Sequence, residues 1–290
     1  MLYKSKLLNW QASRAQSGAC RLVERKTSMP AGARSCGRLV QIARAFTLAF
    51  LIGLCALPAT AQQVVKVGGY DFPPFVDKTA GSASLTFDLI AALNAFQKKY
   101  VFEFVHTSSK RRFSHFDEKR FDLILFEALD WGWLGREIEA TNVIMHGGTV
   151  YVTRMEKYKD QRYFDDLKGK TIWGILGYHY GFANFNSDYE FLKKHFNAHM
   201  ITSQDGLIEA AVAGRADISV VVREYLQIYL LRHPDVQQKI LVSTKFDAVN
   251  SYTILARKGN RPDVAELNKI LSEMESAGIL KKLWGRYNLK

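Results

Sequence analysis

The chain has 290 residues, 48% hydrophobic and 23% charged, which is ordinary for a soluble globular protein and excludes a disordered chain or a membrane bundle. The formal net charge of +12 suggests an acidic partner, but the charge is unevenly distributed. Residues 1–61 hold nine Lys and Arg residues and one acid, which leaves 31 basic and 27 acidic residues, a charge of +4, on residues 62–290. We therefore expect no nucleic-acid partner.

The first segment of the chain has the residue order of a secretory signal peptide. Arg38 and Arg44 precede an apolar stretch at 45–57, which is followed by Pro58 and an A-x-A sequence ending at Ala61. The sequence therefore predicts cleavage after Ala61 and a mature protein in the periplasm.

Other interpretations of this leader stay open. The leader covers residues 1–61, longer than the usual length of about 15 to 30 residues, so Met29 is an alternative start. A membrane anchor is weaker, because 13 apolar residues fall short of the roughly 20 that span a bilayer. A lipoprotein anchor on Cys55 is disfavoured by the preceding Leu54.

All three cysteines lie upstream of the predicted cleavage point, at Cys20, Cys36 and Cys55. The mature chain then has no thiol chemistry, disulfide or Cys-ligated metal. His195 and His199 have no evident third ligand nearby and are interpreted as ordinary surface histidines. We expect no cofactor and no metal.

From residue 64 onward, short apolar runs alternate with helical stretches, which indicates an α/β protein with largely parallel sheets. The first series is predicted as strand 64–70, a loop "DFPPF", helix 84–99, strand 100–106, a short basic helix 110–120 and strand 121–126. The second series is predicted as strand 170–176, a turn at 177–185, helix 187–196, helix 206–215 and strand 216–222. Two similar series suggest two lobes.

Two β-rich segments, 147–154 and 250–258, flank the second series and are expected to cross between the lobes. Lobe one is predicted to comprise residues 64–150 and 254–290, and lobe two residues 154–248. The hinge crossings fall at 151–153 and 249–253.

Six segments in order, among them "VKVGGYDFPPF", "RFDLILF", "DLKGKTIWGILGYHYG" and "AGILKKLWGRY", resemble the family 3 extracellular solute-binding proteins. The resemblance runs from Val64 to about Tyr287. It implies the type II periplasmic binding protein fold, in which each lobe is a mostly parallel sheet flanked by helices and two hinge strands cross between the lobes. It also implies a monomer that closes on an amino-acid-like solute and delivers it to an ABC permease in the inner membrane.

Ligands of open α/β sheets bind outside the carboxyl ends of the strands, so the candidate ligand-binding residues lie in the loops that follow each strand. The resemblance places an aromatic ring against the ligand in the first of these loops. The turn "GYHYGF" offers backbone N–H groups at a helix N-terminus, suited to a carboxylate or phosphate, although its glycines alone would explain a tight turn. The candidates are Tyr70, Asp71, Phe72, Phe75, Phe126, Glu127, Tyr178, His179, Tyr180 and Arg223.

The chain departs from the resemblance after strand 121–126. Where amino-acid binders of the family have a Thr and, three residues later, an Arg that holds the ligand carboxylate, this chain has Trp131 and Leu134. Arg111 is the proposed substitute, with a solvated basic turn as the alternative. Trp131 is expected to form an apolar or stacking wall at the ligand.

Arg223 follows strand 216–222, where the family usually has an Asp for the ligand ammonium group. Arg223 favours an anionic group, or else pairs with Glu224 or Glu127. The expected ligand is therefore a small polar or anionic organic solute.

Two rival functions stay open. A dehydratase-like enzyme would use Glu127 and Asp130 as acid and base. A ligand-sensing protein would serve a separate receptor chain. We expect a binding protein without catalytic residues.

Overall fold

The computed structural model describes residues 62–77 and 84–289, all of which belong to one compact unit, Thr60–Lys290. The first half of the described chain contains β1 (Gln63–Gly69), α2 (Leu85–Phe96), β2 (Tyr100–His106), α3 (Arg112–Asp117), β3 (Leu123–Glu127), β4 (Ile138–Ala140) and β5 (Met145–Arg154). The second half contains β6 (Ile172–Ile175), α4 (Tyr189–Phe196), β7 (Ala198–Ile201), α5 (Gln204–Val212), β8 (Ile218–Val222), α6 (Arg223–Arg232), β9 (Ile240–Arg257), α7 (Val264–Ser276) and α8 (Ile279–Gly285). Short 3₁₀ turns lie at Gln161–Phe164, Gly181–Ala183 and Pro234–Val236.

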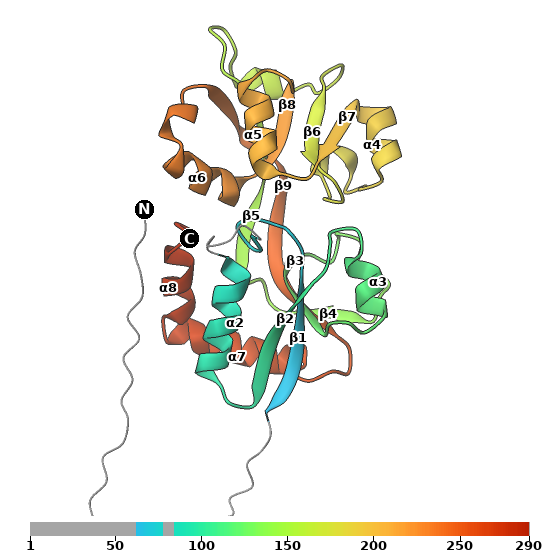
Figure 1. The fold of residues 1–290 in the computed structure, drawn as a ribbon, viewed down its shortest axis with the longest axis vertical. Coiled ribbons are helices and arrows are strands. Elements are labelled where there is room, and N and C mark those ends of the chain that lie inside the picture. Colours follow the sequence, from blue (N-terminus) through green and yellow to red (C-terminus); the bar gives the residue numbers. More distant parts are fainter. Residues whose placement is uncertain (1–61, 78–83, 290) are drawn as a thin grey trace, which may run out of the picture. The chain divides into compact units, whose positions relative to one another are not determined.

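The strands form two lobes joined by the long strand β9 (Figure 1). In lobe one, β1 pairs in parallel with β2 and β3, and β3 and β4 pair antiparallel with residues 253–257 of β9. In lobe two, β6 pairs in parallel with β7 and β8, and β5 pairs antiparallel with β8. Residues 240–252 of β9 run antiparallel to β5, so these two strands connect the sheets.

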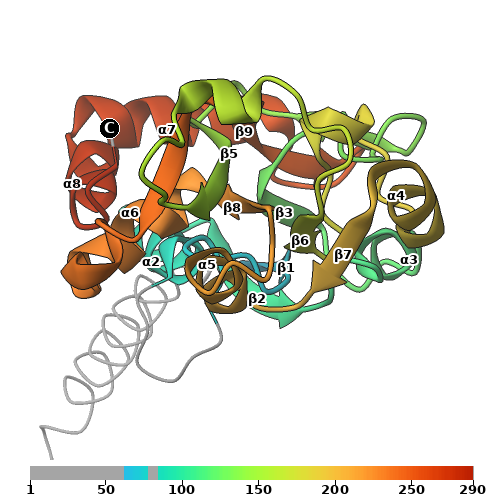
Figure 2. The same ribbon diagram turned by 90° about the horizontal axis from the view of Figure 1, so that it is seen from above.

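Helices cover the sheets through apolar faces that the sequence spacing predicts. Leu85, Leu89 and Leu93 lie one helical turn apart on α2 and are all fully buried, which directs α2 against β2 and α8. In lobe one, α8 and α3 lie on opposite sides of the strands (Figure 1, Figure 2). In lobe two, α5 packs against β8.

Several features of the fold differ from the sequence expectation, among them the short strand β4, which was not expected. Strand β7 was not expected, because its four residues are too short for a clear alternating pattern. Helix α6 was also not expected; it begins directly at Arg223, at the end of β8. Strand β9 starts at Ile240, ten residues before the predicted segment 250–258.

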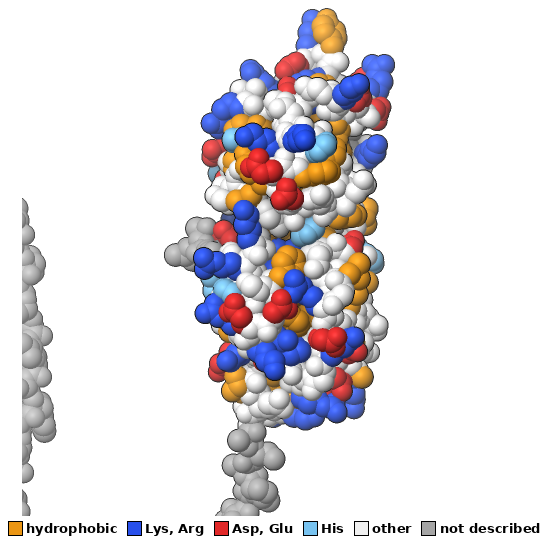
Figure 3. All heavy atoms as spheres, turned by 90° about the vertical axis from the view of Figure 1, so that its right-hand side faces the viewer, with side chains coloured by type: hydrophobic (Ala, Val, Ile, Leu, Met, Phe, Trp, Pro, Cys, Tyr) orange, Lys and Arg blue, Asp and Glu red, His pale blue; other side chains and the backbone are white. Residues whose placement is uncertain are grey.

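Surface charge is mixed on the face seen in Figure 3, where Lys and Arg side chains alternate with Asp and Glu side chains and no stripe of one sign is visible. Within residues 62–77 and 84–289, no helix combines the length and the apolar character needed to cross a membrane. The same residues contain no group of three or more His, Cys, Asp or Glu side chains able to hold a metal ion.

Candidate functional site

A small cavity lies where the carboxyl ends of strands from both lobes meet. Its volume is about 10 Å³, roughly the space of one water molecule. A larger ligand therefore requires the lobes to move apart. The cavity is lined by Tyr70, Phe72, Trp131, Thr149, Tyr178, His179 and Asn250.

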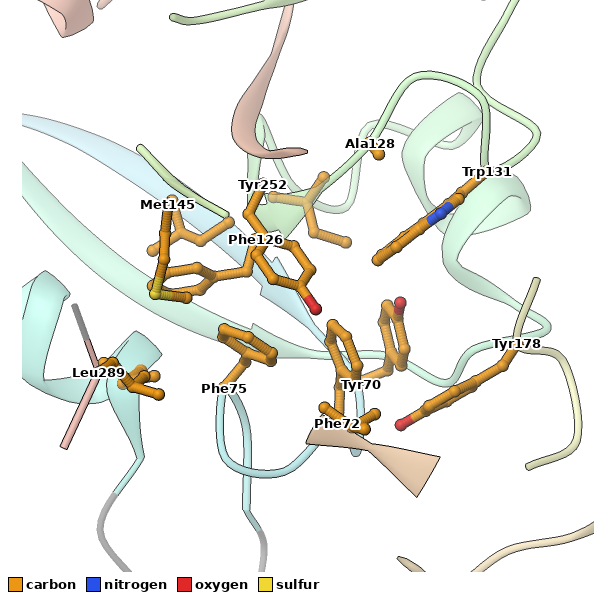
Figure 4. Packing of buried hydrophobic residues seen from close by; sticks show 14 of the residues in the cluster. Tyr70, Phe72, Phe75, Phe126, Ala128, Trp131, Met145, Tyr178, Tyr252 and Leu289 are labelled. Carbon is orange, nitrogen blue, oxygen red and sulfur yellow. The ribbon is translucent and has the colours of Figure 1, made fainter. Parts of the chain in front are cut away.

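Aromatic rings from both lobes fill this cleft (Figure 4). Phe72 stacks on Tyr70 with ring centroids 5.8 Å apart and meets Trp131 edge to face at 5.9 Å. Tyr178 comes from lobe two and meets Phe72 edge to face at 5.2 Å. Its hydroxyl donates a 3.0 Å hydrogen bond to the backbone oxygen of Asp71 in lobe one. Tyr178 therefore joins the two lobes.

Arg112 is the charged group at the centre of the cleft, with only 1% of its surface exposed. Its Nη1 donates to the backbone oxygens of Ser109 and, at 3.4 Å, of Gly177 in lobe two. Its Nη2 donates to the Trp131 oxygen at 3.3 Å and to Nδ1 of His179, also in lobe two, at 3.4 Å. The guanidinium thus bonds to both lobes at once.

Glu127 faces Arg112 from the end of β3. The two form an ion pair, with 3.5 Å between Nε and Oε1, too far for a directional hydrogen bond. The other carboxylate oxygen accepts a 2.6 Å hydrogen bond from Nε1 of Trp133. Burial raises the pKa of Glu127, while Arg112 and Trp133 act against that rise.

A β-bulge at Phe126 directs Glu127 toward the cleft. The register of β3 on β9 shifts between Leu125 and Glu127, and Phe126 adopts φ 57°, which is uncommon for a bulky residue. Such strained positions cluster at functional sites. The bulge is a second indication that the end of β3 belongs to the site.

Lobe two has a half-buried carboxylate, Asp247 on β9. Its oxygens accept hydrogen bonds from the backbone N–H groups of Gly181 at 3.0 Å and Phe182 at 2.8 Å. The hydroxyls of Thr149 at 3.0 Å and Tyr151 at 2.9 Å donate to the same carboxylate. Burial raises the pKa of Asp247, and these donors act against it. The turn predicted to bind an external anion therefore binds Asp247.

The predicted site residues separate into two groups. Tyr70, Phe72, Trp131, Tyr178 and His179 line the cavity, and Glu127 and the backbone of Asp71 border it. Phe75 and Phe126 are fully buried and contact one another in lobe one. Tyr180 is likewise buried, with its hydroxyl bonded to the backbone of Ile175.

The two predicted arginines lie away from the cavity. Arg111 is exposed because α3 begins at Arg112, which places Arg112 and Phe116 on the inward face. Arg223 is 37% exposed and pairs with the buried Glu224 at 3.1 Å, the alternative foreseen from the sequence. Trp133, two residues after Trp131, packs against Phe113 and Phe116 in lobe one.

Sequence reasoning missed Arg112, Thr149, Asp247, Asn250 and Tyr252. Arg112 was hidden in the run "KRR", where only the helix start decides which arginine faces inward. Asn250 and Tyr252 lie on β9 within the predicted hinge segment, and a hydrogen bond of 3.3 Å joins them. Thr149 and Asn250 could have been found as polar residues within apolar strands, because polar side chains are uncommon in buried positions.

No protein-family model and no curated protein matches the chain. Solved structures match it over most of its length. An ancestral arginine-binding protein bound to arginine superposes with a TM-score of 0.59 at 18% identity, covering 78% of this chain and 98% of that one. The GluR0 ligand-binding core from Nostoc punctiforme, in complex with (L)-glutamate, has a TM-score of 0.59 at 17% identity with the same coverage, 78% and 98%.

A third similar structure is an ABC uptake transporter substrate-binding protein from Streptococcus pneumoniae with bound histidine. Its TM-score is 0.61 at 18% identity, and the match covers 77% of this chain and 92% of that one. The predicted fold class is confirmed: the chain has the two-lobed type II periplasmic binding protein fold that these amino-acid-binding proteins share.

Replacing Arg112 with alanine is expected to lower the free energy of unfolding by about 3–5 kcal/mol, because Glu127 would stay buried without its cationic partner. The neighbouring Arg111→Ala is a matched control on the exposed side and should change it by less than about 0.5 kcal/mol. Urea unfolding followed by circular dichroism measures both. Equal losses for the two variants would contradict the central position of Arg112.

His179 predicts a specific pH dependence. Burial, followed by the Arg112 charge, lowers the pKa of His179 from 6.5 to about 3. Between these values the unfolded chain binds a proton that the folded protein does not, so stability is lost as the pH falls below 6.5. Between pH 7 and pH 5 the wild type should lose up to about 2 kcal/mol relative to His179→Gln. Urea unfolding at each pH measures the free energy of unfolding, and the exposed His195→Gln is the control, which should show the same pH dependence as the wild type. If His179→Gln also shows that same pH dependence, the lowered pKa of His179 is refuted.

Proposed function

We propose that the protein is a solute-binding protein that captures a small polar organic solute between its two lobes. The observation that supports this most directly is the aromatic cavity at the carboxyl ends of strands from both lobes, bordered by the buried Arg112 and Glu127. Similar solved structures hold arginine, glutamate or histidine. In this proposal, hydrogen bonds between the lobes open and re-form as the solute enters.

The proposed lobes follow the hinge crossings at 151–153 and 249–253. Lobe one is residues 64–150 with 254–290, and lobe two is residues 154–248. Closure around the solute changes the surface that a partner recognises, and the proposed partner is an ABC permease in the inner membrane. A receptor that senses the closed form is the alternative partner; permease and ATPase genes beside this gene would favour transport.

The dehydratase alternative has one supporting observation. An ancestral amino-acid-binding protein described as a precursor of cyclohexadienyl dehydratase matches with a TM-score of 0.57 at 18% identity, covering 77% of this chain and 94% of that one. Against it, Glu127 is fully buried and ion-paired, whereas Asp130 is exposed, so these two carboxylates do not face one cavity. The binding function is therefore preferred.

Trp131 makes the binding function measurable, because its ring lies at the cavity. A solute that binds should raise the melting temperature and change the tryptophan fluorescence of the wild type. Trp131→Phe should lose most of that change in fluorescence. Trp173→Phe, which alters a tryptophan in contact with the ring of His199 in lobe two, should retain it. Amino acids, dicarboxylates, amines and aromatic acids are the panel, and mass spectrometry monitors each for product. Turnover of a solute without stabilisation would replace the binding function by an enzymatic one.

Secretion is the second part of the proposal. If residues 1–61 are a signal peptide, N-terminal sequencing of protein recovered from the periplasm should begin at Gln62. The Ala61→Pro variant should block cleavage and leave a product larger by the leader, since signal peptidase needs a small residue there. Periplasmic protein that retains residues 1–61 intact would contradict the predicted cleavage.

A further inference from the structure

We propose that lobe two has a second binding site, outside the cleft, for a small organic anion with an aromatic body. The site is a pocket of about 510 Å³, far larger than the cavity of about 10 Å³ in the cleft. Pockets that hold small molecules typically have volumes of about 300–1,000 Å³. Binding at this pocket would be independent of the solute-binding function proposed above.

The pocket lies at the opposite end of the lobe-two strands from the cleft. It is lined by Ile172, the first residue of β6, and by Asn197, which directly precedes β7. Because β6 and β7 run parallel, with Ile172 paired to Ala198, the pocket borders the amino ends of both strands. The cleft instead lies at the carboxyl ends, where Tyr178 and His179 follow β6. The pocket and the cleft cavity share no lining residue.

Three aromatic rings line the pocket, and other contacts hold them in place. The Phe182 ring stacks on Tyr180 with centroids 5.4 Å apart and meets Phe196 edge to face at 5.2 Å. The third ring is that of Tyr151, whose hydroxyl donates a 2.9 Å hydrogen bond to Asp247. The polar end of Tyr151 is thus occupied, and its ring is left as apolar surface. Rings held in this way are preorganised for the flat body of an aromatic ligand.

Three lysines line the pocket, Lys168 and Lys170 before β6 and Lys194 near the end of α4. Asp166 is the acid among the lining residues, and its carboxylate accepts a 2.8 Å hydrogen bond from the backbone N–H of Lys168. Lys170 donates to the backbone oxygen of Asp166 and lies 4.5 Å from the centre of the Tyr163 ring. In the part of the chain that the structure describes, the ammonium groups of Lys168 and Lys194 form no ion pair. These two cations are therefore available to a ligand.

An aromatic anion matches both properties of the pocket. Its ring would lie on Phe182 and Phe196, which are only partly buried in the protein. Its negative group would contact the ammonium group of Lys168 or Lys194, in an ion pair that weakens as salt is added. An amine of the same size would meet the three lysines as like charges. The lysines and the ring surface together therefore favour an acid.

Three compounds that share one ring system and differ in charge test the proposal: indole-3-acetate, indole-3-acetamide and tryptamine. Each would be titrated into the ¹⁵N-labelled protein and followed by NMR. The acid should bind about fivefold more tightly than the amide, and the amine more weakly still. The acid should shift the backbone amide signals of residues 166–170 and 194–197. Shifts confined to the cleft, equal affinity for all three compounds, or an acid that binds more weakly than about 1 mM would each overturn the site.

Lysine variants provide the second arm of the test. In the double variant Lys168→Gln with Lys194→Gln, the advantage of the acid over the amide should fall below about twofold. Lys193→Gln is the matched control, because Lys193 lies beside Lys194 in the last turn of α4 but does not line the pocket. It should keep the full advantage of the acid. A double variant that also keeps it would contradict the proposal.

Trp131→Phe, a change in the cleft, separates this site from the solute-binding function. The variant should bind indole-3-acetate as the wild type does, because Trp131 lines the cleft cavity and not the pocket. If Trp131→Phe weakens binding of the acid, the acid binds in the cleft. That result would overturn the second site and support the solute-binding function.

Discussion

The buried guanidinium of Arg112 is the group on which the closed cleft depends. An unpaired buried charge is strongly destabilising, so a fully buried arginine requires partners on every side. The partners here come from the segment before α3, from the end of β3 and the loop that follows it, and from the turn after β6, segments of both lobes. In the proposed clamp, separation of the lobes would remove the partners Gly177 and His179 from the guanidinium, and water would replace them.

Glu127 and Asp247 give the cleft its electrostatic character. Glu127 is paired with the guanidinium of Arg112, and Asp247 accepts hydrogen bonds from two backbone N–H groups. Each carboxylate therefore neutralises a group that could otherwise bind an external anion. The similar structures bound to arginine, glutamate and histidine all have ligands with a carboxylate. In this chain both carboxylates belong to the protein itself, and the sequence signals the difference only by the absence of the usual Thr and Arg.

The sequence was sufficient for the fold and for part of the site. Alternating strand and helix patterns and the aromatic loop after β1 are local signals, and Tyr70, Phe72 and Tyr178 follow from them because strand ends define the cleft edge. The sequence pointed to Arg111 instead of Arg112. Neighbouring residues lie about 100° apart around a helix, so the helix start decides which arginine faces inward, and no strong cap marks the start of α3. Asp247 was missed because its N–H donors lie 66 and 65 residues away in sequence, beyond the reach of any local pattern.

Strand β9 adds a mechanical consequence. It runs through both sheets. Its central residue Asp247 bonds the turn at Gly181 and Phe182, Asn250 lines the cavity, and the ring of Tyr252 contacts Phe72 and Trp131. In the proposed clamp, the strand that twists when the lobes rotate is the same strand that presents these groups. The proposed hinge and part of the proposed binding site would then be one continuous segment of backbone, so a substitution on β9 would alter the opening rate together with the affinity.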